Sequence, residues 1–148
     1  MRSCNPFFWE IGYVLNENNR ATDIASMARA FGLGKETGIG QIPEESGNIE
    51  DPTDPIQVVN QAIGQGTVQV TPLQVARFIA AIGNGGTLYR PQVVEKIEPV
   101  DGSAGEMVFK PEAQGTLPIQ PFRMDVIKDA MRAVVADPLG TANFRMRG

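Results

Sequence analysis

A serine and an asparagine stand two residues apart near the start of the chain, in the segment Ser3-Cys4-Asn5-Pro6. A hydroxyl and a carboxamide at this spacing can face one cleft when the backbone bends between them. The hydroxyl can then relay a proton, and the amide can hydrogen-bond a peptide-like substrate. A simpler interpretation is that Asn5 is the N-cap of a helix with Pro6 at its first position. The two interpretations are compatible, because a side chain at a helix start can also turn into a cleft.

The composition limits the other kinds of chemistry that the chain can carry out. Its 148 residues include one Cys and no His, which excludes Ser-His-Asp and Cys-His catalysis and most zinc sites. With no histidine to activate it, Cys4 is predicted to be a small buried residue. The net charge of -4 argues against nucleic-acid binding. No cofactor or metal site is predicted, and neither a membrane-spanning run nor a signal peptide is recognisable.

The glycine-rich and acidic segments do not indicate a nucleotide-binding or acid-catalysis site. The segment GLGKETG at 32–38 lacks the spacing of a phosphate-binding loop, and IGQGTVQ at 63–69 lacks the third glycine of a dinucleotide fingerprint. Glu36 and the acidic residues between 44 and 54 are predicted to be surface charges. No carboxylate pair shares a buried helical face, so paired-acid hydrolysis has no support.

Hydrophobic spacing predicts the helices that would position these groups. A first helix is expected over 6–18, and a second follows Thr22 and ends at Gly32. Residues 33–58, rich in Gly, Pro and acids, are predicted to be a long loop. The segment TPLQ at 71–74 predicts a capping box for a helix over 72–82.

The sequence pattern in the second half of the chain predicts a hairpin followed by a helix. The hairpin is predicted from strand formers over 88–98, a turn at 101–105 and a return strand over 106–110. Residues 111–121 are predicted to be irregular. Two strands alone are marginally stable, so the hairpin needs a neighbour that the chain does not obviously supply. A helix over 122–136 is predicted with these residues facing inward: Val126, Ile127, Ala130, Met131 and Val134. The predicted fold class is therefore mainly α with a small antiparallel β hairpin.

Several segments resemble one protein family. Ser3-Cys4-Asn5-Pro6-Phe7-Phe8 resembles the S-x-N segment of the penicillin-binding proteins, and AIGQGTVQVTPLQVARFIAAIGNGGTLYRPQVV at 62–94 is similar to the stretch that follows in that family. AFGLGKETGI at 30–39 is similar to the linker after the family's S-x-N helix, and MRAVVADPLGTA at 131–142 resembles the approach to its K-T-G strand. The likeness is strongest to the class B, elongation-type members.

The resemblance implies acyl transfer through a serine, which uses three motifs: S-x-x-K, S-x-N and K-T-G. It implies a proton-transfer role for Ser3, contact with the substrate amide for Asn5, and a place near the cleft for Gln65 in the GQG turn. No serine of the chain is followed three residues later by lysine, and no K-T-G occurs. Residues 1–148 are therefore expected to be the central part of a transpeptidase domain, with a partial β-lactamase-like fold, and to be inactive alone.

The resemblance also implies a cellular setting. The parent protein is expected to be anchored in the bacterial inner membrane, to act on its outer side on peptidoglycan stem peptides, to be trapped by β-lactams, and to work with cell-elongation proteins. Two alternatives stay open: a non-catalytic penicillin-binding-like sensor or scaffold, and a self-contained helical interaction module. A piece of a larger domain should expose core residues such as Phe7, Phe8 and Phe78, through which it could dimerise.

Overall fold

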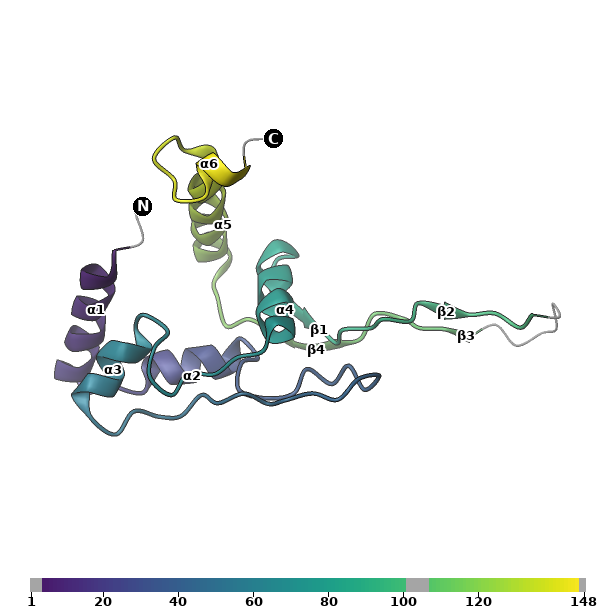
Figure 1. Ribbon diagram of the computed structural model, residues 1–148, viewed down its shortest axis with the longest axis horizontal. Coiled ribbons are helices and arrows are strands. Elements are labelled where there is room, and N and C mark those ends of the chain that lie inside the picture. The colour runs from purple at the N-terminus through teal and green to yellow at the C-terminus, as the bar shows by residue number, and fades with distance from the viewer. Residues whose placement is uncertain (1–3, 101–106, 147–148) are drawn as a thin grey trace.

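The computed structural model describes residues 4–100 and 107–146. It consists of helices joined to a long two-stranded ribbon that extends away from them (Figure 1). In chain order the elements are α1 (Asn5–Glu17), α2 (Asp23–Ala30), α3 (Pro55–Gln61), α4 (Pro72–Gly83), β1 (Thr87–Tyr89), β2 (Lys96–Ile97), β3 (Met107–Val108), β4 (Ala113–Thr116), α5 (Pro121–Ala136) and α6 (Asn143–Met146). The predicted class, mainly α with a small antiparallel β component, is confirmed.

The first helix begins one residue earlier than expected. Cys4 occupies the N-cap with no side-chain cap hydrogen bond, and Asn5 is the first residue of α1. The prediction that Asn5 is the N-cap is therefore wrong. The prediction that Cys4 is buried is wrong too, because Cys4 precedes α1 and is exposed.

The second helix ends in the glycine cap that the sequence predicts. Gly32 has a φ of +84°, the left-handed conformation that glycine adopts without steric cost. Its N–H donates to the carbonyl of Arg29 at 2.9 Å, and the N–H of Leu33 donates to that of Ala28 at 3.2 Å. This pair of bonds is a Schellman motif, which satisfies the last carbonyls of α2.

The predicted loop over 33–58 contains the start of a helix that hydrophobic spacing did not reveal. Asp54 is the N-cap of α3, and its side chain accepts a hydrogen bond from the N–H of Gln57 at 2.9 Å. Pro55 follows in the first turn, where its missing N–H costs nothing. The helix is only 7 residues long, too short to show a clear apolar period.

The fourth helix carries the predicted capping box and supports the core. The side chain of Thr71 accepts from the N–H of Gln74 at 3.2 Å, and the side chain of Gln74 accepts from the N–H of Thr71 at 3.1 Å. Phe78 packs edge-on against Phe31 with ring centroids 6.0 Å apart. The buried core cluster joins α4 to β1, to the residue that follows β4 and to α5, and consists of Ala81, Ile82, Leu88, Leu117 and Met124.

The antiparallel strand pairing predicted for the hairpin is confirmed and extends further than expected, while the predicted turn at 101–105 lies outside the described residues. Lys96 pairs with Val108 and Ile97 with Met107, antiparallel. The ribbon continues inward, where Thr87 pairs with Thr116 in β1 and β4. The strand β4 lies inside the segment predicted to be irregular, so this part of the prediction is wrong. It provides the pairing partner for β1 that the sequence did not reveal.

The last long helix is less buried than its spacing suggested. Ile127 packs against the core, but Val126 is 65% exposed and Met131 39% exposed, and the buried residue of α5 is Met124. The short helix α6 folds back on α5, where the Asn143 side chain donates to the carbonyl of Val135 at 2.7 Å. Among the described residues, no helix is long and apolar enough to cross a membrane.

Candidate functional site

The three residues proposed for chemistry occupy two separate segments. Ser3 lies outside the described residues. Asn5 is exposed in the first turn of α1, and no hydrogen bond from the described part of the chain engages its side chain. Gln65 is exposed in the turn that follows α3. No hydrogen bond among the described residues joins Asn5 to Gln65.

The turn that carries Gln65 is fixed by backbone hydrogen bonds to the end of α3. The N–H of Gln65 donates to the carbonyl of Asn60 at 2.9 Å, and the N–H of Gly64 donates to that of Gln61 at 3.0 Å. Gly64 and Gly66 have φ values of +70° and +82°, which explains the glycine on each side of Gln65. The side chain of Gln65 therefore projects from a defined turn.

Helix α1 is held against α3 by a close backbone approach. A Cβ at Gly12 would lie 3.0 Å from the Cα of Val59, so only glycine lets the helices meet this closely. Gly12 lies seven residues after Asn5, which corresponds to about 10 Å along the helix axis. The contact therefore holds α1, which carries Asn5, against α3, which precedes Gln65.

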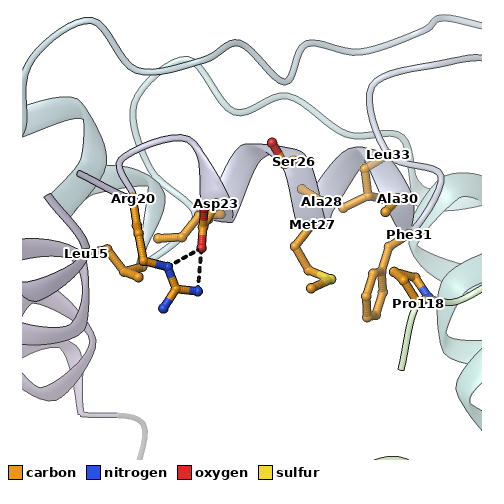
Figure 2. A pocket seen from close by; sticks show the side chains of 11 residues that line it. Leu15, Arg20, Asp23, Ser26, Met27, Ala28, Ala30, Phe31, Leu33 and Pro118 are labelled. Atoms are coloured by element: carbon orange, nitrogen blue, oxygen red, sulfur yellow. Dashed lines mark hydrogen bonds and ion pairs between the residues drawn. The ribbon is translucent and has the colours of Figure 1, made fainter. Parts of the chain in front are cut away.

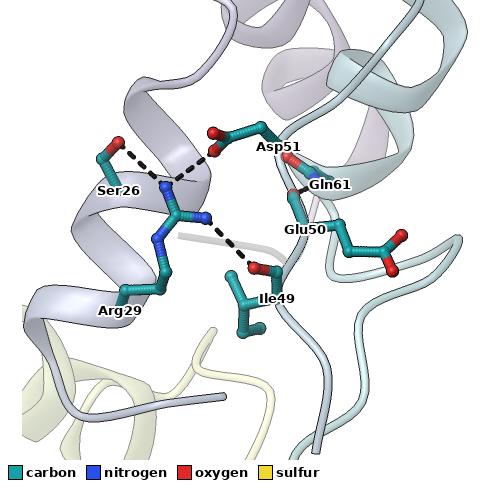
Figure 3. A network of polar contacts seen from close by, with 6 residues as sticks. All are labelled: Ser26, Arg29, Ile49, Glu50, Asp51 and Gln61. Atoms are coloured by element: carbon teal, nitrogen blue, oxygen red, sulfur yellow. Dashed lines mark hydrogen bonds and ion pairs between the residues drawn. The ribbon is translucent and has the colours of Figure 1, made fainter. Parts of the chain in front are cut away.

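A polar network fastens the segment 49–51 between α2 and α3 (Figure 3). Arg29 donates to the carbonyl of Ile49 at 3.0 Å and to the carboxylate of Asp51 at 2.7 Å. From α3, the Gln61 side chain donates to the carbonyl of Glu50 at 2.7 Å. These bonds connect α2 and α3 through the loop.

The carboxylate of Glu44 organises a second loop, and its role was missed by the sequence analysis. It accepts from the Thr37 hydroxyl at 2.5 Å, and from the backbone N–H groups of Thr37 at 3.0 Å, Gly38 at 2.7 Å and Ile39 at 3.1 Å. The prediction that the acids of residues 44–54 are surface charges is therefore wrong for Glu44, which is half-buried. Burial by itself raises the pKa of this carboxyl, but the four hydrogen bonds favour the anion and leave the pKa below its ordinary value.

Two buried polar residues of α4 connect the helix to the loop and the ribbon. The amide of Gln74, 1% exposed, donates to the carbonyls of Lys35 at 2.7 Å and Ser46 at 2.9 Å. Arg77, 8% exposed, donates to the carbonyl of Tyr89 at 2.9 Å and to the side chain of Gln114 at 2.5 Å. Burial lowers the pKa of Arg77 and the charge of Glu44 opposes that shift, so the guanidinium stays cationic. Both residues act as structural supports.

An apolar groove of about 630 Å³ runs along α2. Figure 2 shows Leu15 of α1 at one end and Pro118, before α5, at the other, with Met27 and Phe31 between them. Arg20 and Asp23 form an ion pair at its edge with a 2.6 Å contact. Ser26 also lines the groove, and Arg29 donates to its hydroxyl at 3.4 Å, but within residues 4–100 and 107–146 no base is hydrogen-bonded to that hydroxyl. The described residues contain no cluster of metal-binding side chains.

Comparison with known proteins identifies a matching family and several relatives that are similar in sequence. The model of the penicillin binding protein transpeptidase domain matches residues 1–148. The chain is 37% identical over 101 residues to stage V sporulation protein D of Bacillus subtilis, covering 66% of this chain and 15% of that protein. It is 41% identical over 81 residues to the peptidoglycan D,D-transpeptidase FtsI of Escherichia coli, covering 53% of this chain and 13% of that protein. The chain thus spans less than a sixth of the length of these relatives.

A solved structure shares the fold. Penicillin-binding protein A from Mycobacterium tuberculosis, in an imipenem acyl-enzyme complex, superposes with a TM-score of 0.78 and 26% sequence identity, covering 99% of this chain and 32% of that one. The fold predicted from the resemblance is therefore confirmed, as is the family. This chain belongs to the transpeptidase domain family of the penicillin-binding proteins.

Proposed function

We propose that residues 1–148 are the central part of the transpeptidase domain of a serine D,D-transpeptidase that cross-links the peptides of peptidoglycan. The observation that carries the proposal is the family match over residues 1–148 together with the S-x-N pattern of Ser3-Cys4-Asn5. The name of the E. coli relative, a peptidoglycan D,D-transpeptidase, supports the reaction class.

In this proposal Ser3 and Asn5 serve a nucleophile that is not in the sequence described here. The hydroxyl of Ser3 relays a proton with the lysine of an S-x-x-K motif, and the amide of Asn5 hydrogen-bonds the substrate peptide. The exposure of Asn5 in the first turn of α1 supports this role, because its amide is not engaged by the described residues. Gln65, exposed on the turn after α3, is proposed to contact the substrate.

The chain alone is proposed to be inactive. None of its serines is followed three residues later by lysine, so it has no candidate nucleophile with an adjacent lysine base. In the parent protein the missing groups would come from other segments, and a β-lactam would acylate the serine of S-x-x-K. The imipenem acyl-enzyme of the M. tuberculosis relative supports this chemistry. The parent is proposed to be anchored in the inner membrane and to act on its outer side with cell-elongation partners.

Exposed aromatic residues favour this proposal over a self-contained helical module. Phe7 is 58% exposed, Phe8 37% and Trp9 41%, all in the first turns of α1. Apolar side chains gathered in this way mark a surface that another segment covers. The expectation that Phe78 is exposed is wrong, because Phe78 packs against Phe31 and the core. A non-catalytic sensor or scaffold would have the same exposed surface, and intact S-x-x-K and K-T-G motifs in the flanking gene sequence would favour the enzyme over it.

A chimera tests the proposal. Residues 1–148 replace the segment of M. tuberculosis penicillin-binding protein A on which they superpose, and fluorescent penicillin is added to the chimera and to the 148-residue chain. We expect covalent label on the chimera and none on the chain. Label on the chain would overturn its proposed inactivity. A chimera with a cooperative thermal transition but no label would overturn the transpeptidase assignment.

A further inference from the structure

The loop 62–68 carries the glutamine proposed to contact the substrate, and one neighbouring segment holds both of its ends. At the start of the loop, the buried side chain of Gln61 donates to the carbonyl of Glu50 at 2.7 Å (Figure 3). At its end, the N–H of Asn48 donates to the carbonyl of Gln69 at 2.8 Å, and the N–H of Gln69 donates back at 2.9 Å. These two bonds form an isolated antiparallel bridge.

The side chain of Asn48 adds a contact inside the loop. Its Nδ2 donates to the carbonyl of Thr67 at 3.2 Å. On the other side of the turn, the N–H of Gln65 donates to the carbonyl of Asn60 at 2.9 Å. The exposed side chain of Gln65 therefore projects between one bond to the end of α3 and one bond to Asn48.

A glycine lets the two backbones of the bridge meet. Gly47 has a φ of +67°, and a Cβ at this position would overlap the carbonyl oxygen of Gln69. Glycine adopts this conformation without steric cost and leaves room for that oxygen. The close approach of the segment to the loop is therefore built into the sequence at Gly47.

The segment that holds the loop is itself anchored to two helices. The side chain of Gln74 in α4 donates to the carbonyl of Ser46 at 2.9 Å, and Arg29 of α2 donates to that of Ile49 at 3.0 Å. Asn48 lies between these two anchored carbonyls. The helices thus give Asn48 a fixed position against which it can hold the loop.

We propose that Asn48 is a positioning residue for the transpeptidase reaction, which holds the loop so that Gln65 meets the substrate peptide without reorganisation. The inference rests on the proposed contact between Gln65 and the substrate. Asn48 touches no reacting group and acts through the Thr67 carbonyl. A loop that is already ordered pays less conformational entropy when the substrate binds. Loss of the Asn48 side chain therefore slows the reaction only while Gln65 is present.

A double-mutant cycle in the chimera with penicillin-binding protein A tests this dependence. The second-order rate constant for acylation by fluorescent penicillin should fall about 5- to 10-fold in Gln65→Ala and about 3- to 5-fold in Asn48→Ala, the range for one hydrogen bond. In the Gln65→Ala background, Asn48→Ala should change it by less than about 2-fold. Glu45→Ala, an exposed neighbour outside these contacts, is the control and should leave the rate within about 2-fold of the parent.

Two results of the cycle would overturn the positioning role. One is an Asn48→Ala effect of equal size in both backgrounds, because a merely structural role is independent of Gln65. The other is an Asn48→Ala rate equal to that of Glu45→Ala. An unlabelled parent chimera would overturn the proposed function itself, and unchanged acylation in Gln65→Ala would overturn the substrate contact on which the inference rests.

Amide hydrogen exchange in the 148-residue chain tests the hold on the loop independently of the transpeptidase assignment. The amide of Gln65 should exchange about 3- to 10-fold faster in Asn48→Ala, because the loop opens locally more often. The amide of Gly86, which donates to the carbonyl of Ala81 at 2.7 Å, reports on the core and should be unchanged. Equal exchange of the Gln65 amide in Asn48→Ala and Glu45→Ala would overturn the role of Asn48.

Discussion

Gly12 of α1 and Val59 of α3 meet backbone to backbone. A side-chain carbon at Gly12 would lie 3.0 Å from the Cα of Val59 and 3.1 Å from the Cβ of Ala62. This contact fixes the helix that begins with Asn5. The glycine costs helix propensity at a mid-helix position, and the close packing offsets that cost.

Enlarging Gly12 should therefore destabilise the fold. Gly12→Val is expected to lower the free energy of unfolding by about 1–3 kcal/mol, because the added carbons force the helices apart. The matched control is Gly83→Val at the end of α4, where a Cβ would meet nothing within 4 Å. Urea unfolding checks both variants. Equal midpoints would contradict the close α1–α3 contact.

Arg77 should not tolerate replacement by lysine. Its guanidinium bonds both the carbonyl of Tyr89 and the side chain of Gln114, and a lysine ammonium cannot reproduce that fork. Arg77→Lys is expected to lower the free energy of unfolding by about 1–3 kcal/mol. Arg132→Lys, in an exposed pair with Asp129, should change it by less than about 0.5 kcal/mol. Equal effects in urea unfolding would show that Arg77 does not support the ribbon.

Glu44 should make stability depend on pH in the acid range. Its folded-state pKa lies below the ordinary value of 4.5, so the unfolded chain binds the proton more tightly. The stabilisation is complete above about pH 4.5 and is lost as pH falls through the lower, folded-state pKa. Glu44→Gln should therefore be less stable than the parent chain at neutral pH, and the difference should shrink below pH 4.5.

Urea midpoints between pH 7 and pH 3 measure this dependence. The neighbouring Glu45→Gln is the control, because Glu45 is exposed and no resolved hydrogen bond of the loop depends on it. A difference between Glu44→Gln and the parent chain that stays constant across this range would rule out the proposed role of the carboxylate.

The exposed start of α1 should bind a hydrophobic dye. Phe7, 58% exposed, stands beside Phe8 with ring centroids 5.3 Å apart. The 148-residue chain is expected to enhance the dye's fluorescence, and Phe7→Ser to reduce it. Val100→Ser, which removes an exposed apolar side chain from the ribbon, should have less effect. A monomeric chain that does not enhance the fluorescence of the dye would instead favour a self-contained helical module.

Local signals in the sequence predicted much of the fold. The Thr71–Gln74 capping box and the Gly32 cap depend on residues within one helical turn, so their chemistry is readable directly. The strand β4 was missed because it is short and is fixed by its pairing with β1. The start of α3 has a local cap, Asp54 followed by Pro55, and was missed because the helix is too short to show an apolar period. The inward face of α5 was mispredicted for a similar reason, since its burial depends on what covers it.

The candidate site was predictable only in part. The resemblance singled out Asn5 and Gln65, and the structure shows both exposed on segments that are joined through α1 and α3. The supporting roles of Glu44 and Arg77 could not be predicted, because their partners lie far away in the chain or are backbone groups. Gln114, for example, is 37 residues from Arg77.

The most direct test of the central claim is the acylation rate of the chimera with fluorescent penicillin. Ser3→Ala and Asn5→Ala should each lower the second-order rate constant by about 10²-fold or more, the range for loss of a proton relay or of a positioned hydrogen bond. Asn18→Ala, at the other end of α1, should leave it within a factor of about two, because Asn18 only caps the carbonyl of Val14. Equal rates for Asn5→Ala, Ser3→Ala and Asn18→Ala in folded chimeras would contradict the account.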